Sequence, residues 1–177
     1  WSHADCFEGE KDEYIKSFVH RNYTIGFHTH SFYELNIVLS GRGEHLIEEM
    51  HFEVKRGCVF VIPPNAKHSY KNIDSLDVYH LLIHRDFLPN CFGEFFKTPG
   101  FSLLFEIEPY FRARYHENMF LTLSEVELNS VLSDVELLKS CSALYDSQIY
   151  ANAIAKKILA FLCICITKQS GIGGINA

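Results

Sequence analysis

The stretches FHTHSFYELNIVLSG (residues 27–41) and GCVFVIPPNAKHSYKN (residues 57–72) decide how this chain can fold. Together they carry three histidines and one glutamate: His28, His30, Glu34 and His68. Side chains alternate across a β-strand, so positions of equal parity share one face. If residues 27–39 form one unbulged strand, the two histidines and the glutamate of the first stretch project to the same side.

The region from residue 13 to residue 85 reads as a succession of short strands. Weakly alternating or apolar runs predict strands over 13–20, 22–27, 32–40, 43–49, 52–55, 58–62, 67–72 and 76–84. Gly, Pro and Asn recur between these runs, and Gly41 is expected to form a turn because glycine adopts positive φ without steric cost. Eight short strands with closely spaced turns are typical of an antiparallel barrel.

The two histidine-bearing stretches resemble the paired motifs of the cupin superfamily, a small antiparallel barrel of jelly-roll type. The first cupin motif contributes two histidines and a glutamate, and the second contributes one histidine. The resemblance therefore implies a metal site made of His28, His30, Glu34 and His68. The chain departs from the family pattern at Asn22 and Asn65, where the family has glycine. Asparagine tolerates a left-handed backbone better than most residues.

Two interpretations of this cluster follow. Three neutral imidazoles and a carboxylate suit a divalent transition metal such as Zn, Ni, Fe, Mn or Cu. In the other interpretation no metal is bound, and His28 and His30 hydrogen-bond a sugar or carboxylate effector directly. Either way, parity and proximity predict a ligand pocket lined by His28, His30, Glu34, Phe60, His68, Tyr70, Asn72 and His80.

Four histidines receive structural or surface assignments, and one of them, His80, is also a candidate for the pocket. His84 is expected at a structural or surface position, as is His80 if it does not reach the pocket. His45 and His51 lie near an expected hairpin at residues 48–51 and are expected to be exposed to solvent.

Residues 86–121 change character. The segment has three prolines and is rich in phenylalanine, without a sustained apolar period. We expect loops and short turns that pack on the outside of the barrel or cover its mouth.

From residue 122 to residue 168 the sequence predicts an antiparallel two-helix hairpin. Ser124 and Glu127 form a capping-box signature, apolar residues recur at spacings of three and four, and a break falls near residues 145–147. The apolar surface exceeds what one hairpin can bury, so we expect docking on the barrel or on a second copy. The predicted dimerisation residues are Val131, Leu138, Ile154, Ile158 and Phe161.

Composition limits the classes of partner. The chain has 177 residues and a net charge of −6, and no cluster of Lys and Arg is visible, which argues against direct nucleic-acid binding by this fragment. The six cysteines show no CxxC pair and are expected to be reduced in a cytoplasmic protein.

The apolar run at residues 154–168 contains lysines and is expected to fall short of a membrane span. Residues 1–12 are polar and are expected to be a flexible arm or a cloning remnant.

The order of a small barrel, an aromatic connector and a helical hairpin resembles the N-terminal half of AraC-type bacterial transcription regulators. The phrases HTHSFYELNIVLSGRGEH, KRGCVFVIPPNAKHSY and LLIHRDFLP carry this resemblance. It implies a small-molecule effector, such as a sugar, in the barrel and a homodimer formed through the hairpin. It also implies a helix-turn-helix DNA-binding half, which we expect to lie outside this chain, beyond a linker at residues 169–177.

The alternative is a metal-dependent cupin enzyme of the dioxygenase or isomerase type, with open metal positions for substrate or oxygen. The apolar hairpin favours the sensor, since a stand-alone enzyme has no evident use for it. The lack of an obvious second acid or base near the site also favours binding over catalysis. We therefore expect a protein that is not an enzyme.

Overall fold

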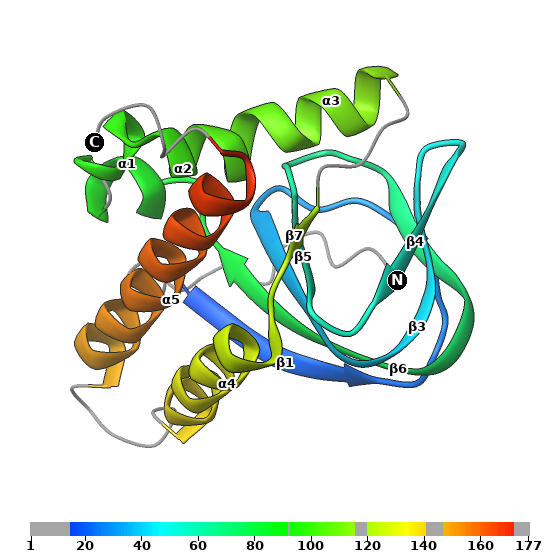
Figure 1. The fold of residues 1–177 in the computed structure, drawn as a ribbon, viewed down its shortest axis with the longest axis horizontal. Coiled ribbons are helices and arrows are strands. Elements are labelled where there is room, and N and C mark those ends of the chain that lie inside the picture. Colours follow the sequence, from blue (N-terminus) through cyan, green and yellow to red (C-terminus); the bar gives the residue numbers. More distant parts are fainter. Residues whose placement is uncertain (1–14, 92, 116–119, 141–146, 172–177) are drawn as a thin grey trace.

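The structure is a computed structural model that describes residues 15–91, 93–115, 120–140 and 147–171 (Figure 1). The expected arm at residues 1–12 and most of the expected linker at residues 169–177 lie outside these ranges. In the described part, strands form a curved sheet at one side of the molecule and helices cover the other (Figure 1).

The sheet has seven strands, and all of its pairings are antiparallel. The strands are β1 (Ile15–Arg21), β2 (Ile25–His28), β3 (Tyr33–Ile47), β4 (Met50–Lys55), β5 (Cys58–Ile62), β6 (His68–Ile83) and β7 (Leu121–Thr122). Their order is β1-β6-β3-β5-β7, with β2 also paired to β6 and β4 also paired to β3. The predicted mainly β, antiparallel fold class is confirmed.

Two pairs of predicted strands are each one long strand. The runs at 32–40 and 43–49 join in β3, and those at 67–72 and 76–84 join in β6. Gly41 was expected to form a turn, but it lies inside β3 with φ +69°, where the register with β6 shifts. Ser75 faces it on β6, also at positive φ. The two irregularities bend the strand pair without ending it, because a bulge increases local bending and twist.

Replacing Gly41 with alanine is expected to lower the free energy of unfolding by roughly 2–3 kcal/mol. A Cβ at this position would lie 2.2 Å from the Ser75 carbonyl oxygen, and the positive φ adds strain. The matched control is Gly26→Ala in β2, where a Cβ would meet nothing within 4 Å. Denaturant unfolding of both variants measures the difference, and equal stabilities would contradict this account of the bulge.

The strand pleat divides the core into two apolar layers. Odd-numbered side chains such as Leu35, Val59 and Val61 face the helices, while even-numbered neighbours such as Val38 and Phe60 face the barrel interior. Both layers are almost fully buried, as expected for a sheet covered on both faces. The interior layer supports the polar cluster described below.

The segment expected to be loops is largely helical. It contains α1 (Phe87–Cys91), η1 (Phe95–Lys97), α2 (Pro99–Ser102), η2 (Leu103–Ile107) and α3 (Glu108–Tyr115). The side chain of Thr98 accepts a hydrogen bond from the Phe101 amide, and Pro99 begins α2, which is the usual chemistry of a helix start. The expectation of loops was wrong because short, closely joined helices buried among neighbours leave no clear period of 3.6.

Two long helices complete the chain: α4 (Glu125–Ser140) and α5 (Ser147–Gln169). Figure 1 shows them running in opposite directions beside the barrel. The predicted capping box is present, since Glu127 accepts hydrogen bonds from the Ser124 amide and hydroxyl. The break predicted at residues 145–147 falls almost entirely outside the described residues.

The predicted dimerisation residues need correction. Val131, Leu138, Ile154 and Ile158 are buried in the core of this same chain, and Phe161 is half-buried against it. They cannot offer a free surface because the helices use them to dock on the barrel. The apolar side chains that α4 and α5 do expose are Val126, Leu137, Ile149, Tyr150 and Ile164.

Helix α5 extends well beyond the apolar run at residues 154–168 that was expected to be too short for a membrane span. Residues Gln148–Gln169 have the length and hydropathy of a membrane span, contrary to the expectation above. Within the described structure, however, Ala155, Ile158, Leu159 and Leu162 are buried in the domain core. The same composition therefore serves a packed core helix here.

Candidate functional site

The four predicted metal ligands converge, although not from one strand. Strand β2 ends at His28 and β3 begins at Tyr33, so the expectation of a single unbulged strand over residues 27–39 was wrong. His28 lies directly opposite His68 in the pairing of β2 with β6. The link between β2 and β3 carries His30, and its carbonyl accepts a hydrogen bond of 2.8 Å from the Asn65 amide. Asn65 adopts φ +68°, as expected for a glycine-like position.

Three of the four predicted ligands lie within reach of a single ion, and His30 lies beside Glu34 at the edge of this group. Ligand atoms of His28, Glu34 and His68 all lie within 4.8 Å of one another. The Nε2 atom of His30 is 3.5 Å from Oε2 of Glu34. The ring centroids of His28 and His30 lie 4.1 Å and 5.1 Å from that of His68.

Backbone carbonyls orient all three imidazoles in the same way. The Nδ1 atoms of His28, His30 and His68 lie 3.0, 2.7 and 3.1 Å from the carbonyl oxygens of Gly26, Phe32 and Ala66. A carbonyl only accepts, so each Nδ1 carries the proton and each Nε2 carries a lone pair. This is the tautomer in which histidine binds a metal.

The donor set therefore fits a metal ion. Nε2 of His30 and Nε2 of His68 are buried and have no hydrogen-bond partner among the described residues. Buried polar atoms normally find a partner. A cation between these lone pairs and the Glu34 carboxylate would satisfy them, and such mixed nitrogen and oxygen ligands suit Zn, Ni, Fe or Mn.

Burial keeps the site in the protonation state that a metal requires. It lowers the pKa of His68 to about 4 and also lowers the pKa of His30. For Glu34, burial alone would raise the pKa, but the charge of His80 and its hydrogen bond outweigh that effect and lower it. At neutral pH His30 and His68 are therefore neutral and the Glu34 carboxylate is ionised.

The metal-free protein is expected to lose stability in mild acid. The folded pKa of His68, about 4, lies below its ordinary value of 6.5, so the unfolded chain takes up the proton first. Stability is therefore unaffected above pH 6.5 and is lost as the pH falls from 6.5 towards 4. Between pH 7 and 5.5, His68 alone should account for about 1 kcal/mol of unfolding free energy. Urea unfolding at both values should show this loss in wild type and a smaller loss in His68→Gln; parallel losses would contradict it.

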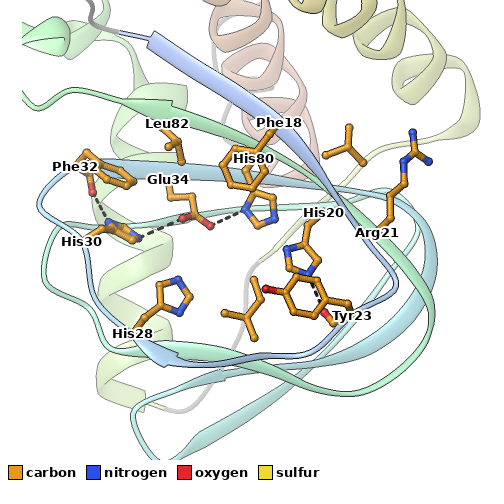
Figure 2. Close-up of a pocket in the computed structure, with 12 residues that line it drawn as sticks. Phe18, His20, Arg21, Tyr23, His28, His30, Phe32, Glu34, His80 and Leu82 are labelled. Carbon is orange, nitrogen blue, oxygen red and sulfur yellow. Dashed lines mark hydrogen bonds and ion pairs between the residues drawn. The ribbon is translucent and has the colours of Figure 1, made fainter. Parts of the chain in front are cut away.

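A cavity of about 360 Å³ opens beside this cluster. Figure 2 shows His28 and His30 at one end, Glu34 and His80 near the middle, and His20, Arg21 and Tyr23 at the other end. The remaining lining residues are apolar or aromatic: Phe18, Val19, Ile25, Phe32 and Leu82. The exposed side chains of Arg21 and Tyr23 mark the mouth.

The predicted pocket set divides into three groups. His28, His30, Glu34 and His80 line the cavity. His68, Phe60 and Tyr70 are buried in the barrel interior. Asn72 lies neither in the lining of this cavity nor in the barrel interior.

Asn72 is exposed and donates a hydrogen bond of 2.8 Å to Glu44 at the surface. Parity failed because Asn72 has φ +49° and the register between β3 and β6 shifts nearby. Its backbone therefore departs from a regular strand.

His45 is a second correction. It was expected at the surface but is fully buried, with its ring stacked on Phe60 at 4.6 Å and tilted against Tyr70 at 4.8 Å. Burial, followed by the charge of Arg112, holds its pKa well below the ordinary value. His51, by contrast, is exposed as expected and hydrogen-bonds Glu44.

Helix α3 lies across one end of the barrel (Figure 1) and contributes Arg112, which the sequence did not single out. Arg112 is buried, donates to the Val61 carbonyl and pairs with Glu108 at 3.0 Å. Its guanidinium carbon lies 5.6 Å and 5.3 Å from the ring centres of Phe60 and Phe120. Burial lowers its pKa, against the opposing effect of Glu108.

The cavity wall from β1 and β2 was also missed. Phe18, His20, Tyr23 and Ile25 lie on predicted strands, and the even parity of Phe18 and His20 could have placed them on the face of the barrel that carries His28. His20 has its pKa lowered by burial, and its ring stacks on that of Tyr23 at 4.0 Å.

Residues 11–147 match the family model of the AraC-like ligand binding domain. The chain belongs to this family. The AraC-like ligand-binding domain is similar to the HTH-type transcriptional activator RhaR of Pectobacterium carotovorum subsp. carotovorum (strain PC1), with 31% identity over 82 residues. This match covers 46% of the chain and 29% of the relative. RhaR of Escherichia coli O139:H28 (strain E24377A / ETEC) is 33% identical over 75 residues, which cover 42% of the chain and 27% of the relative.

The matched segments thus span less than a third of these relatives. Among solved structures, a cupin protein from Bacteroides fragilis aligns with a TM-score of 0.37 and 16% identity over 41% of the AraC-like domain and 67% of that chain. The predicted assignment to the effector-sensing part of AraC-type regulators, with a mainly β barrel and C-terminal helices, is confirmed.

Proposed function

We propose that this AraC-like domain binds a small molecule in the cavity beside His28, His30 and Glu34, and that binding controls a DNA-binding part outside this chain. The observation that carries the proposal is the cavity itself. Its volume, about 360 Å³, lies in the usual range of small-molecule sites, and polar groups at its two ends are separated by apolar and aromatic side chains.

A divalent transition metal (Zn, Ni, Fe or Mn) held by His28, His30, Glu34 and His68 is part of this proposal. The ion would supply a positive charge that can bind an oxygen of the effector. The chain's own contribution is to keep His30 and His68 neutral by burial and to orient the Nε2 atoms of all three imidazoles inward through the Nδ1 hydrogen bonds.

A sugar is the effector class that fits these groups. The fixed tautomers present acceptor lone pairs, and sugar hydroxyls can donate hydrogen bonds to them or bind a metal through oxygen. At this end of the cavity a free carboxylate effector would meet Glu34 and these lone pairs unless a metal intervened, because the donors Arg21 and Tyr23 line the other end.

We infer binding rather than catalysis at this centre. A hydrolytic or isomerising enzyme needs a group that can release a proton to its substrate. His28, His30 and His68 each direct the Nδ1 proton to a backbone carbonyl. The dioxygenase or isomerase alternative requires turnover of a substrate by the metal-loaded protein, and detection of such turnover would overturn the inference.

We also propose a cytoplasmic homodimer. Val126 and Leu137, eleven residues apart on α4, share one helix face and are both exposed. This face replaces the predicted set, which is buried. A sedimentation mass close to the 20.4 kDa of one chain at micromolar concentration would contradict the dimer.

Filling the cavity is expected to abolish effector binding. Ile25 is half-buried in the cavity wall, so Ile25→Trp places a larger ring in the cavity. A sugar that raises the thermal unfolding midpoint of wild type should leave that of Ile25→Trp unchanged. The control is Ile149→Trp, which makes the same substitution at a position 78% exposed on α5. Equal stabilisation of all three proteins would place the binding site elsewhere.

A further inference from the structure

The Glu34 carboxylate is held by one neighbouring side chain, His80. The two residues lie on adjacent strands, β3 and β6, and both are buried. Nδ1 of His80 is 2.8 Å from Oε1 of Glu34 (Figure 2). Because an ionised carboxylate only accepts, the proton of this hydrogen bond lies on Nδ1 of His80.

The two carboxylate oxygens of Glu34 have different neighbours. Oε1 is used by His80, while Oε2 lies 3.5 Å from Nε2 of His30. Oε2 is therefore the oxygen that faces the other candidate ligands. Without a donor on Oε1, the buried carboxylate could rotate and would lack the charge-assisted bond that stabilises its ionised form.

The His80 ring is itself fixed. It stacks on Phe18 with centroids 4.8 Å apart and planes inclined by 13°. Phe18 and Asn36 are its strand partners on the two sides. A ring held by a flat neighbour on one face and a carboxylate at Nδ1 has little freedom to turn.

We propose that His80 is a positioning residue that orients Glu34 so that Oε2 binds the metal. This inference rests on the metal centre of the proposed function. His80 does not bind the ion. It acts through Glu34, in the way that hydrogen-bonded outer groups orient metal-ligating carboxylates.

Metal affinity provides the first test. In His80→Phe the ring and its stacking on Phe18 remain but the donor is lost, so Zn(II) affinity should fall about 10- to 100-fold. His80→Asn restores an N–H donor and should recover part of the loss. The matched control is His51→Phe, which makes the same substitution at an exposed imidazole that bonds Glu44 instead of Glu34. Chelator-competition titrations measure all four proteins, and an unchanged affinity in a folded His80→Phe would overturn the proposal.

Nuclear magnetic resonance of the metal-free wild type provides a second test that does not depend on metal binding. Long-range ¹H–¹⁵N correlations should show a proton on Nδ1 of His80. The ¹³C signal of the Glu34 carboxyl should shift in His80→Asn but not in His51→Phe. If wild type binds no Zn(II), the metal part of the proposed function fails, while these spectra still decide the role of His80. Protonation at Nε2 alone would overturn it, even if His80→Phe did not fold.

Discussion

One equivalent of Zn(II) is expected to bind the wild-type domain, and His68→Ala is expected to weaken that binding by more than about 100-fold. Loss of an outer group that orients a ligand costs about 10- to 100-fold, and loss of a ligand should cost more. His68 is fully buried beside the rings of His28 and His30 and is the strand partner of His28. The ring of His45 lies 5.8 Å from that of His68 but stacks on Phe60 and is not opposite His28.

Calorimetry with Zn(II) and metal analysis after dialysis would measure this effect. His51→Ala is the control, because His51 is exposed and bonds Glu44 instead of a predicted ligand. Equal Zn(II) affinity of wild type and His68→Ala would contradict the proposed metal site. Absence of metal in a wild type that still binds a sugar would leave an organic-ligand cavity, in which His28 and His30 contact the effector directly.

Arg112→Met is expected to lower the free energy of unfolding by about 3–5 kcal/mol, because removing one partner leaves the Glu108 charge in the buried end of the barrel. The loss should be smaller in the double variant Arg112→Met with Glu108→Leu, since replacing both charges by apolar groups is often close to neutral.

Denaturant unfolding of these variants measures the effect of the pair. Arg114→Met is the matched control, since Arg114 lies on the same helix but is exposed. If Arg112→Met and Arg114→Met are equally stable, the buried pair does not hold α3 to the barrel.

The cluster of ligands could be predicted from spacing and resemblance, whereas its supporting residues could not. His28, His30, Glu34 and His68 meet even though the strand assumed for them is broken between His28 and Tyr33. The bonds that fix them run to backbone carbonyls of residues that no motif marks.

Predictions from parity failed wherever the backbone left the regular strand conformation. Gly41, Asn72 and Ser75 all have positive φ, and the register shifts around them carry Asn72 outward. His45 was misplaced for another reason. Its burial depends on Arg112 and Phe60, which approach from segments far along the chain, and no local pattern reports such a contact.

The helices show the same division between local and distant causes. The capping box at Ser124 is local chemistry and was correctly predicted. The partner of the apolar faces is a global property. The sequence left open whether the barrel or a second copy of the chain would cover Val131 and Ile158. Their burial in the core of this chain shows that the helices pack these residues against the barrel.

The closure of one barrel end by Arg112 has a kinetic consequence. With α3 across that end, Arg21 and Tyr23 are the exposed side chains of the described cavity lining beside the connection between β1 and β2. Arg21 forms an ion pair of 3.2 Å with Asp77, and residues 22–24 of this connection are exposed. For an effector in the proposed cavity, we therefore expect the residence time to depend on the short connection between β1 and β2, separately from the contacts that set its affinity.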